Sequence, residues 1–204
     1  MSSVCILDYG SGNVKSVYNL FSSIEPDTFV SNEEAAIVKA SHVVLPGVGA
    51  FGAAMRKIHH RLPLAALERE VRVGGKPFLG ICVGMQVLAQ RSLEFGEFDG
   101  LGWLPGTVEK LDTAGMPLPH IGWNNTIATR ECALLAGLGD APDFYFVHSF
   151  AMNPGDASHV AARTSYGHDF CSVVHHGNVF GVQFHPEKSQ RAGARLIKNF
   201  LGVK

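Results

Sequence analysis

The sequence predicts an α/β fold, with an open, mostly parallel sheet flanked by helices and with antiparallel strands added in the second half. Two observations lead to this prediction. Over the first 90 residues, short apolar runs alternate with helical patterns, which is the order of strand and helix in a parallel sheet. From about residue 100, glycine and proline become frequent and the strand candidates shorten, which favours hairpins. Because the 204 residues contain no repeat or linker, residues 1–204 are expected to form a single domain.

The spacing of apolar residues indicates where each element lies. Continuous apolar runs bounded by Gly or Pro predict buried strands, and apolar residues at i, i+3, i+4 and i+7 predict helices. The first half is expected to contain strand 4–7, helix 12–23, strand 42–45, helix 50–73 broken near Pro63, strand 77–81 and helix 82–89. The second half is expected to contain strands 107–111, 144–147, 170–175 and 179–184, a hairpin turn at 176–178, and helix 190–201 with Gly202 in the C′ position.

The composition excludes several classes of protein. Apolar residues make up 46% of the chain and charged residues 17%, which excludes a disordered or fibrous protein. The formal net charge is −1 without blocks of like charge, so neither a nucleic acid nor a membrane is an expected partner. No apolar run approaches the roughly 20 residues that span a bilayer. The cysteines lie far apart and are expected to be reduced thiols of a cytoplasmic protein: Cys5, Cys82, Cys132 and Cys171.

The segment Gly-Ile-Cys-Val-Gly at 80–84 follows an apolar strand and opens a helical pattern. This is the nucleophile-elbow arrangement with cysteine in place of serine, in which a sharp turn exposes the nucleophile above the sheet. The helix N-terminus favours the Cys82 thiolate, and the amide of Val83 points toward a developing oxyanion. The alternative, a buried cysteine on a core strand, is about equally common for such a segment taken alone.

A second segment supplies a base for this nucleophile. The apolar strand 179–184 leads into His185-Pro186-Glu187. A thiol nucleophile needs a base and a group that orients the base, roles that His185 and Glu187 can fill. A lone histidine at a strand end is usually a surface residue. However, Cys82 and His185 both follow strands of an open α/β sheet, and ligands bind at that edge.

Neither a metal site nor a cofactor is expected, although the chain has ten histidines. The adjacent pairs His59-His60 and His175-His176 point to different sides of a helix or strand, and no Cys or His stands three or four residues after either pair.

Three segments resemble the class I glutamine amidotransferases: Pro-Gly-Val-Gly at 46–49, the 80–86 elbow, and Gln-Phe-His-Pro-Glu-Lys-Ser at 183–189. Three others are similar to one branch of that family, the glutaminase subunits of imidazole glycerol phosphate synthases from histidine biosynthesis. These are Asp-Tyr-Gly-Ser-Gly-Asn at 8–13, Pro-His-Ile-Gly-Trp-Asn at 119–124 and Phe-Val-His-Ser-Phe at 146–150. The resemblance extends from residue 4 to about 201 and implies a flavodoxin-like glutaminase fold.

The resemblance implies that L-glutamine is the substrate. Cys82 would attack its side-chain amide to release ammonia and form a γ-glutamyl thioester, which water hydrolyses to glutamate. His185 would shuttle the proton, and Glu187 would orient His185. The oxyanion would be held by the amides of Val83 and of Val48 or Gly49. The family's substrate contacts match Gly49, Gln86, Glu94, Ser149 and Phe150.

Without the resemblance, Gln86 and Glu94 would be interpreted as solvated helix surface. Two positions depart from the family's usual residues, because Val83 replaces Leu and Phe150 replaces Tyr. The first change leaves the backbone amide intact. The second would weaken glutamine binding only if the tyrosine hydroxyl takes part.

The resemblance also implies a partner. Ammonia in neutral water is mostly ammonium, which is no nucleophile, so an acceptor must receive it directly. In the family that acceptor lies on a (β/α)8-barrel cyclase, which forms a heterodimer with the glutaminase. Asn13, Trp123 and Lys188 match positions at that interface. Trp123 has the size of an interface anchor, with a core tryptophan as the alternative, and Lys188 could equally be a solvated charge.

Three other functions remain open. Another ammonia-donating glutaminase, such as that of vitamin B6 synthesis, lacks the 119–124 motif. A free-standing cysteine peptidase or γ-glutamyl hydrolase would be highly active alone. A non-catalytic module would not need Cys82, His185 and Glu187 together.

Overall fold

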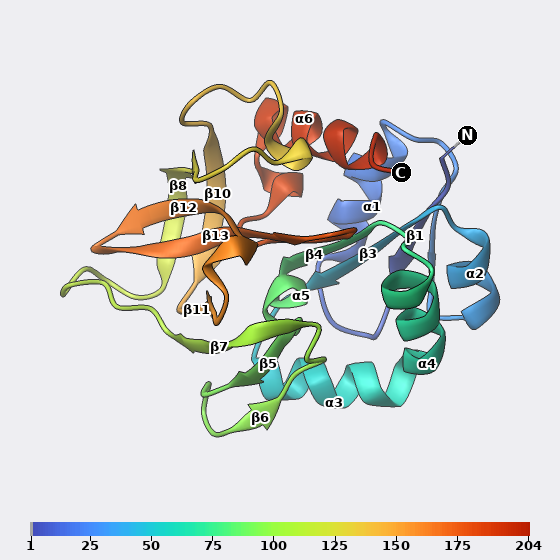
Figure 1. The fold of residues 1–204 in the computed structure, drawn as a ribbon, viewed down its shortest axis with the longest axis horizontal. Coiled ribbons are helices and arrows are strands. Elements are labelled where there is room, and N and C mark those ends of the chain that lie inside the picture. The colour runs from blue at the N-terminus through green and yellow to red at the C-terminus, as the bar shows by residue number, and fades with distance from the viewer. Residues whose placement is uncertain (1) are drawn as a thin grey trace.

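A computed structural model describes residues 2–204 and places an eight-stranded sheet at the centre of the molecule (Figure 1). The strand order is β2-β1-β3-β4-β14-β13-β12-β9. The first five strands are parallel: β2 (Thr28–Ser31), β1 (Val4–Leu7), β3 (His42–Gly47), β4 (Phe78–Cys82) and β14 (Val179–Val182). The other three are antiparallel: β13 (His168–His176), β12 (Val160–Tyr166) and β9 (Ile127–Ala128).

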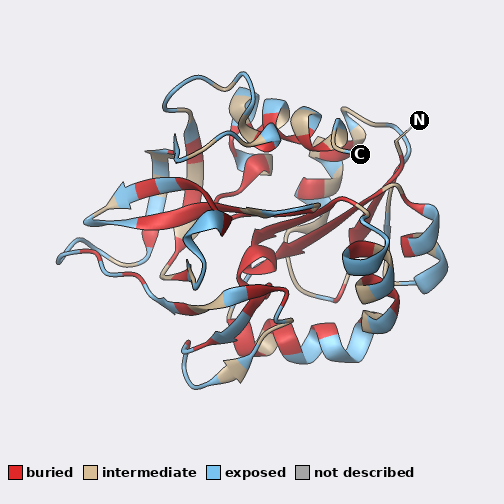
Figure 2. Cartoon of the chain, viewed as in Figure 1, coloured by how far each residue is buried: buried red, intermediate tan, exposed pale blue. Residues whose placement is uncertain are grey.

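Helices cover both faces of this sheet (Figure 1). On one face lie α1 (Val14–Ser22) and α6 (Gln190–Leu201), whose Phe21 and Phe200 rings meet edge to face at 6.4 Å. On the other face lie α3 (Phe51–Arg61) and α4 (Leu64–Leu67), which runs into the π-helix η1 (Glu68–Val73), while α2 (Glu34–Lys39) packs beside α4. Every residue of β1, β3, β4 and β14 is buried, as Figure 2 shows, because parallel strands covered on both faces need continuous apolar runs.

Two smaller sheets are built from strands between residues 89 and 154. One has the order β11-β7-β5-β6 and consists of β11 (Phe150–Pro154), β7 (Leu104–Lys110), β5 (Ala89–Ser92) and β6 (Phe98–Asp99). The other pairs β8 (His120–Asn125) with β10 (Asp143–His148). Short helical turns complete the fold: α5 (Val83–Gln86), η2 (Ala133–Leu135), η3 (Ala157–His159) and η4 (Pro186–Lys188).

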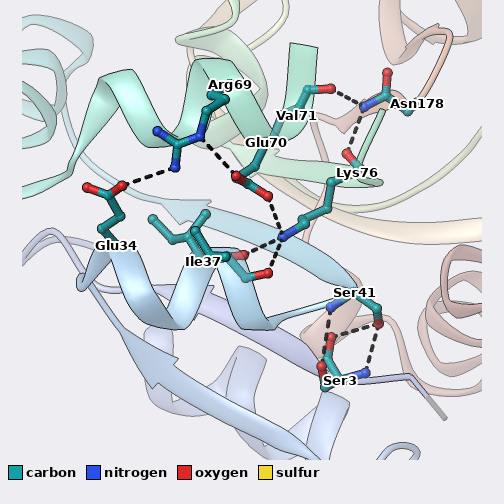
Figure 3. A network of polar contacts seen from close by, with 10 residues as sticks. Ser3, Glu34, Ile37, Ser41, Arg69, Glu70, Val71, Lys76 and Asn178 are labelled. Atoms are coloured by element: carbon teal, nitrogen blue, oxygen red, sulfur yellow. Dashed lines mark hydrogen bonds and ion pairs between the residues drawn. The ribbon is translucent and has the colours of Figure 1, made fainter. Parts of the chain in front are cut away.

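A polar network joins the helices of one face to the sheet (Figure 3). The Lys76 ammonium donates to the carbonyls of Ile37 and Val38 at the end of α2, at 2.6 and 2.9 Å, and pairs with Glu70 at 3.2 Å. A lysine at this place satisfies carbonyls that the helix leaves unpaired. Asn178, in the β13–β14 turn, donates to the carbonyls of Val71 and Lys76. The network therefore ties α2, η1 and the start of β4 together.

The structure confirms the α/β class and the parallel first half, but it corrects some elements. The expected helix 82–89 ends at Gln86, because the next residues pair with a distant segment: Leu101 donates to the Val87 carbonyl at 2.7 Å. Gly202 is the C-cap residue but has a right-handed φ of −83° rather than a left-handed one. Strands β2, β5, β6, β8, β9, β11 and β12 and helix α2 were not expected. Within residues 2–204, no helix is both long and apolar enough to span a bilayer.

Candidate active site

Cys82 occupies a strained turn where β4 ends and α5 begins. Its φ of 55° and ψ of −112° lie where L-residues rarely occur. Gly80 and Gly84 permit this turn, because a Cβ on Gly84 would lie 1.8 Å from the Leu45 carbonyl oxygen, and a Cβ on Gly80 would lie 2.3 Å from that of Gly84. The predicted elbow is therefore present, and the amide of Val83 follows the sulfur at the first position of α5.

His185 and Glu187 form a buried pair beside this turn. The His185 Nδ1 donates to Glu187 Oε1 at 2.7 Å, and the two side chains are 2% and 1% exposed. The backbone amide of His185 donates to the Tyr145 carbonyl at 2.9 Å, which attaches the segment after β14 to β10. Since Nδ1 is taken by the carboxylate, Nε2 is the nitrogen free to exchange a proton with Cys82.

Asn13 adds a second hydrogen bond to Glu187. Its side-chain amide donates to the same Oε1 that receives His185 Nδ1. Asn13 is the N-cap residue of α1, yet its side chain does not cap the helix. Because the Glu187 oxygen accepts hydrogen bonds from both side chains, the carboxylate is fixed in place and holds the imidazole in one tautomer and one orientation.

The imidazole of His185 carries a proton readily. Burial alone would lower its pKa, but the nearby Cys82 sulfur and the Glu187 carboxylate outweigh burial and raise the pKa of His185 to about 9. At neutral pH the imidazolium therefore faces the sulfur. This is the proton donor that a departing amine requires.

Cys82 and His185 open into a pocket of about 270 Å³, below the range of roughly 300–1,000 Å³ typical of drug-sized ligands, so it suits a small metabolite. Its lining consists of Val48, Gly49, Cys82, Val83, Gln86, Glu94, Phe95, Val147, His148, Ser149, Phe150 and His185. All the residues that the sequence assigned to the oxyanion and the substrate are in this set. Larger hollows of about 540 Å³ beside Trp123 and 690 Å³ beside Arg130 contain neither Cys82 nor His185.

Gln86 and Glu94 are buried in this pocket rather than solvated on a helix, with exposed fractions of 3% and 9%. Gln86 Nε2 donates to the Phe150 carbonyl at 2.9 Å and to Gln183 Oε1 at 3.0 Å. Glu94 Oε2 accepts from the Phe51 amide at 2.7 Å, at the first residue of α3. Each side chain is thus held by the protein through one end.

The loop after β3 forms the wall that faces Val83. The Val48 carbonyl accepts a hydrogen bond from Ser11 Oγ at 3.2 Å. In a trans peptide the following N–H points the opposite way, so this contact also sets the direction of the Gly49 amide. Gly49 has a φ of +87°, and a Cβ built on it would meet no atom within 4 Å, so the peptide has space to rotate.

Comparison with known proteins places this geometry in a family. The family model for glutamine amidotransferase class-I matches residues 5–203. The chain belongs to the class I glutamine amidotransferases.

Relatives that align over nearly their full length indicate which branch of the family this chain is most similar to. The chain is 48% identical to imidazole glycerol phosphate synthase subunit HisH of Salinibacter ruber over 204 residues, covering 97% of this chain and 93% of the relative. It is 43% identical to the subunit of that name from Aquifex aeolicus, covering 96% and 94%. The resemblance seen in the sequence is confirmed.

Solved structures agree on the fold. A crystal structure of a glutamine amidotransferase superposes with a TM-score of 0.76 at 18% identity, covering 98% of this chain and 99% of that one. The structure of PurLQS from Thermotoga maritima superposes with a TM-score of 0.73 at 20% identity, covering 99% of each chain.

This amidotransferase also has a pair of neutral histidines, of which His148 lines the pocket and His120 lies next to it. His148 Nδ1 lies 3.0 Å from the Phe150 carbonyl, and its Nε2 lies 3.0 Å from His120 Nδ1. Because a carbonyl only accepts, His148 must carry its proton on Nδ1 and accept from His120 through Nε2. Burial lowers the pKa of His148 to about 3 and that of His120 to about 4, so both stay neutral.

The residues assigned to a partner interface lie in two places. Trp123 is 49% exposed, so it is no core tryptophan. Its ring lies 6.1 Å from that of Tyr145, and the Lys188 ammonium lies 5.4 Å above the same Tyr145 ring. Trp123, Tyr145 and Lys188 thus form one aromatic and cationic surface. Asn13 is instead turned toward Glu187.

Sequence reasoning missed three residues of the amidotransferase pocket and one residue behind it. Phe95, Val147 and His148 line the pocket, and Gln183 Nε2 lies 3.7 Å from the Cys82 sulfur. His148 and Gln183 lie within motifs that the sequence analysis recognised, but the motifs alone did not indicate what these two side chains do. Phe95 had no local signal, because its ring reaches the site through a turn with φ of 55°.

Proposed function

We propose that this chain is the glutaminase subunit of an imidazole glycerol phosphate synthase, which releases ammonia from L-glutamine and passes it to a cyclase partner. The observation that carries the proposal is the strained Cys82 turn facing the His185–Glu187 pair in a pocket lined by the assigned substrate residues. The names of its full-length relatives support the choice of synthase. In this proposal residues 1–204 act as one amidotransferase domain in the cytoplasm, where four free thiols stay reduced.

In the first half-reaction, the Cys82 thiolate attacks the side-chain carbonyl carbon of glutamine. The carbonyl oxygen becomes an oxyanion, which accepts hydrogen bonds from the amides of Val83 and of Val48 or Gly49. His185 Nε2 gives its proton to the nitrogen, the carbon–nitrogen bond breaks, and ammonia leaves. The product on the enzyme is a γ-glutamyl thioester, and His185 is now neutral.

In the second half-reaction, neutral His185 takes a proton from water, and the hydroxide attacks the thioester. The carbon–sulfur bond breaks, and Cys82 leaves as a thiolate beside the imidazolium. The sum is glutamine plus water giving glutamate plus ammonia. Glu187 keeps Nε2 directed at the sulfur throughout.

Substrate recognition follows from the groups that line the pocket. Glu94 and the Gln86 carbonyl oxygen supply acceptors for N–H groups of glutamine. Ser149, Phe150 and Gly49 border its backbone end. The Phe150 carbonyl carries the hydrogen bonds from Gln86 and His148. Phenylalanine in place of the family's usual tyrosine keeps that main-chain arrangement.

The partner that suits this chemistry is a (β/α)8-barrel cyclase bound as a heterodimer. Isotope transfer tests the pairing: the complex is given amide-¹⁵N glutamine in a buffer containing excess unlabelled ammonium. We expect the imidazole product to carry ¹⁵N without dilution by the bulk pool. Glutamate release that is equally fast without a partner, with diluted label in the product, would favour a free-standing hydrolase.

Trp123→Ala is expected to weaken assembly with the cyclase by about 2 kcal/mol or more, because Trp123 is exposed and flanked by Tyr145 and Lys188 like an interface anchor. Isothermal titration calorimetry on the two purified chains measures this change. Ile127→Ala, which removes an exposed apolar side chain from β9, is the matched control and should leave the affinity unchanged. An unaltered affinity for the Trp123 variant would remove Trp123 from the interface.

A further inference from the structure

Gln183 places a buried amide against the reacting sulfur. Gln183 directly follows β14 in the sequence, and it is fully buried. The Nε2 lies 3.7 Å from Cys82 Sγ, and the Oε1 lies 3.0 Å from Gln86 Nε2. A buried amide must find partners within the protein, and these two contacts supply one for each end.

A single carbonyl determines which way this amide points. The Phe150 oxygen can only accept, so the amide nitrogen of Gln86 must face it, as it does at 2.9 Å. The second hydrogen of that nitrogen is donated to Gln183 Oε1. Rotating the Gln183 amide by half a turn would set two NH₂ groups against each other and put a carbonyl oxygen against the sulfur. The Gln183 nitrogen is therefore the end that meets Cys82.

We propose that Gln183 is a further catalytic residue, whose Nε2–H donates a hydrogen bond to the Cys82 sulfur and stabilises it as a thiolate. This inference rests on the proposed function, because it assigns a role toward the same nucleophile. Gln183 exchanges no proton. Its hydrogen bond stabilises the negative charge of the thiolate before the attack and again when the sulfur leaves the thioester. The same hydrogen bond directs the sulfur toward the pocket.

Other groups around the sulfur do not replace this donor. His185 supplies a proton and a charge from the end of β14, and it must release both during the reaction. Tyr9, from the segment after β1, keeps its phenol proton because burial raises its pKa, but its hydroxyl makes no hydrogen bond to the sulfur. Glu94 across the pocket is a carboxylate engaged with α3, and His148 beside it is neutral. Gln183 is thus a donor to the sulfur that keeps its protons in every step.

The test is the alkylation of Cys82 by iodoacetamide in the whole chain across a range of pH. Gln183→Met keeps an unbranched side chain of similar volume and removes the donor. We expect its Cys82 alkylation to slow about tenfold or more at neutral pH, with the midpoint of the pH profile about one unit more alkaline, as for a lost hydrogen bond to a charge. Cys82→Ser measures alkylation at the other thiols.

Ser172→Ala is the matched control. Ser172 is also fully buried, and its carbonyl, which the substitution keeps, accepts the Gln183 backbone amide at 2.9 Å. The Cys82 alkylation profile of the Ser172→Ala variant should stay unchanged. In steady-state glutaminase assays of the complex, Gln183→Met should lower kcat and leave KM nearly constant. A rise in KM alone would mean that Gln183 only supports Gln86 in substrate binding, and would overturn the proposal.

A measurement on the unaltered chain covers the case in which Gln183→Met does not fold. The side-chain amide protons of Gln183, followed by NMR, should shift with pH in step with the Cys82 alkylation profile, and Cys82→Ser should abolish the shift. An unmoved Gln183 signal, or an unchanged profile in folded Gln183→Met, overturns the role of Gln183 while leaving the glutaminase proposal intact. A Cys82→Ser variant that still hydrolyses glutamine would overturn the proposed function itself.

Discussion

Cys82→Ser is expected to abolish glutamine-dependent product formation, with a loss of about 10⁴-fold or more, while the cyclase partner still forms product from added ammonium salts. The loss is large because the serine hydroxyl lacks the thiolate that attacks the amide, and removal of a nucleophile leaves only binding and oxyanion contacts. Ammonium use should persist because, in the proposed division of labour, the acceptor chemistry lies on the partner. Product formation by the complex is measured once with glutamine and once with ammonium as the nitrogen source, so that both expected results are tested.

Cys171→Ser is the matched control, because Cys171 is a buried thiol whose pKa burial raises to about 12, and Cys171 does not line the pocket. It should keep both activities. If Cys82→Ser assembles normally with the cyclase yet loses ammonium-dependent synthesis as well, the division of labour between the two chains is wrong.

The isolated chain is expected to turn glutamine over at least about a hundredfold more slowly than the complex with its nucleotide ligand, chiefly in kcat. We attribute this difference to the Val48–Gly49 peptide. The Ser11 hydroxyl holds its carbonyl in the present orientation, and the open space at Gly49 allows the peptide to rotate once that hydrogen bond breaks. We expect partner and ligand to favour the orientation in which an amide faces the oxyanion beside Val83. Losing one such donor costs about 10²–10³ in rate.

Steady-state glutaminase kinetics on the chain alone, with the cyclase, and with cyclase and nucleotide measure this effect. Gly49→Pro serves as the matched variant, because a proline fixes φ near −65° and has no N–H to donate. It should keep the low activity in all three states. An equal kcat for the unaltered chain in the three states would exclude a switch in this loop and would favour a free-standing hydrolase.

Much of the fold follows from the sequence because its central strands are buried on both faces. The apolar runs of β1, β3, β4 and β14 need no knowledge of their neighbours to be recognised. The strand β2 lies at the edge of the sheet with partly exposed residues, so its run is interrupted. Strand β5 depends on pairing with a segment beyond residue 97, which no local pattern encodes.

The candidate site follows from the sequence where a motif carries it. The elbow around Cys82 and the His185–Glu187 spacing each predict a local geometry that the structure contains. The assignment of Glu94 to the substrate pocket came only from the family resemblance, because Glu94 is held there by a contact with α3 that no local pattern encodes. The hydrogen bond from Gln183 to the sulfur joins residues 101 positions apart, and an alternating strand pattern alone does not reveal it.

Trapping of the covalent intermediate tests the central claim most directly. The complex, mixed with glutamine and quenched in acid within its first turnovers, is digested and analysed by mass spectrometry. The account predicts one γ-glutamyl group on the peptide that contains Cys82, formed at the rate of ammonia release and absent from Cys82→Ser. Ammonia and glutamate appearing in a first-turnover burst while Cys82 stays unmodified, or the acyl group on another residue, would contradict it.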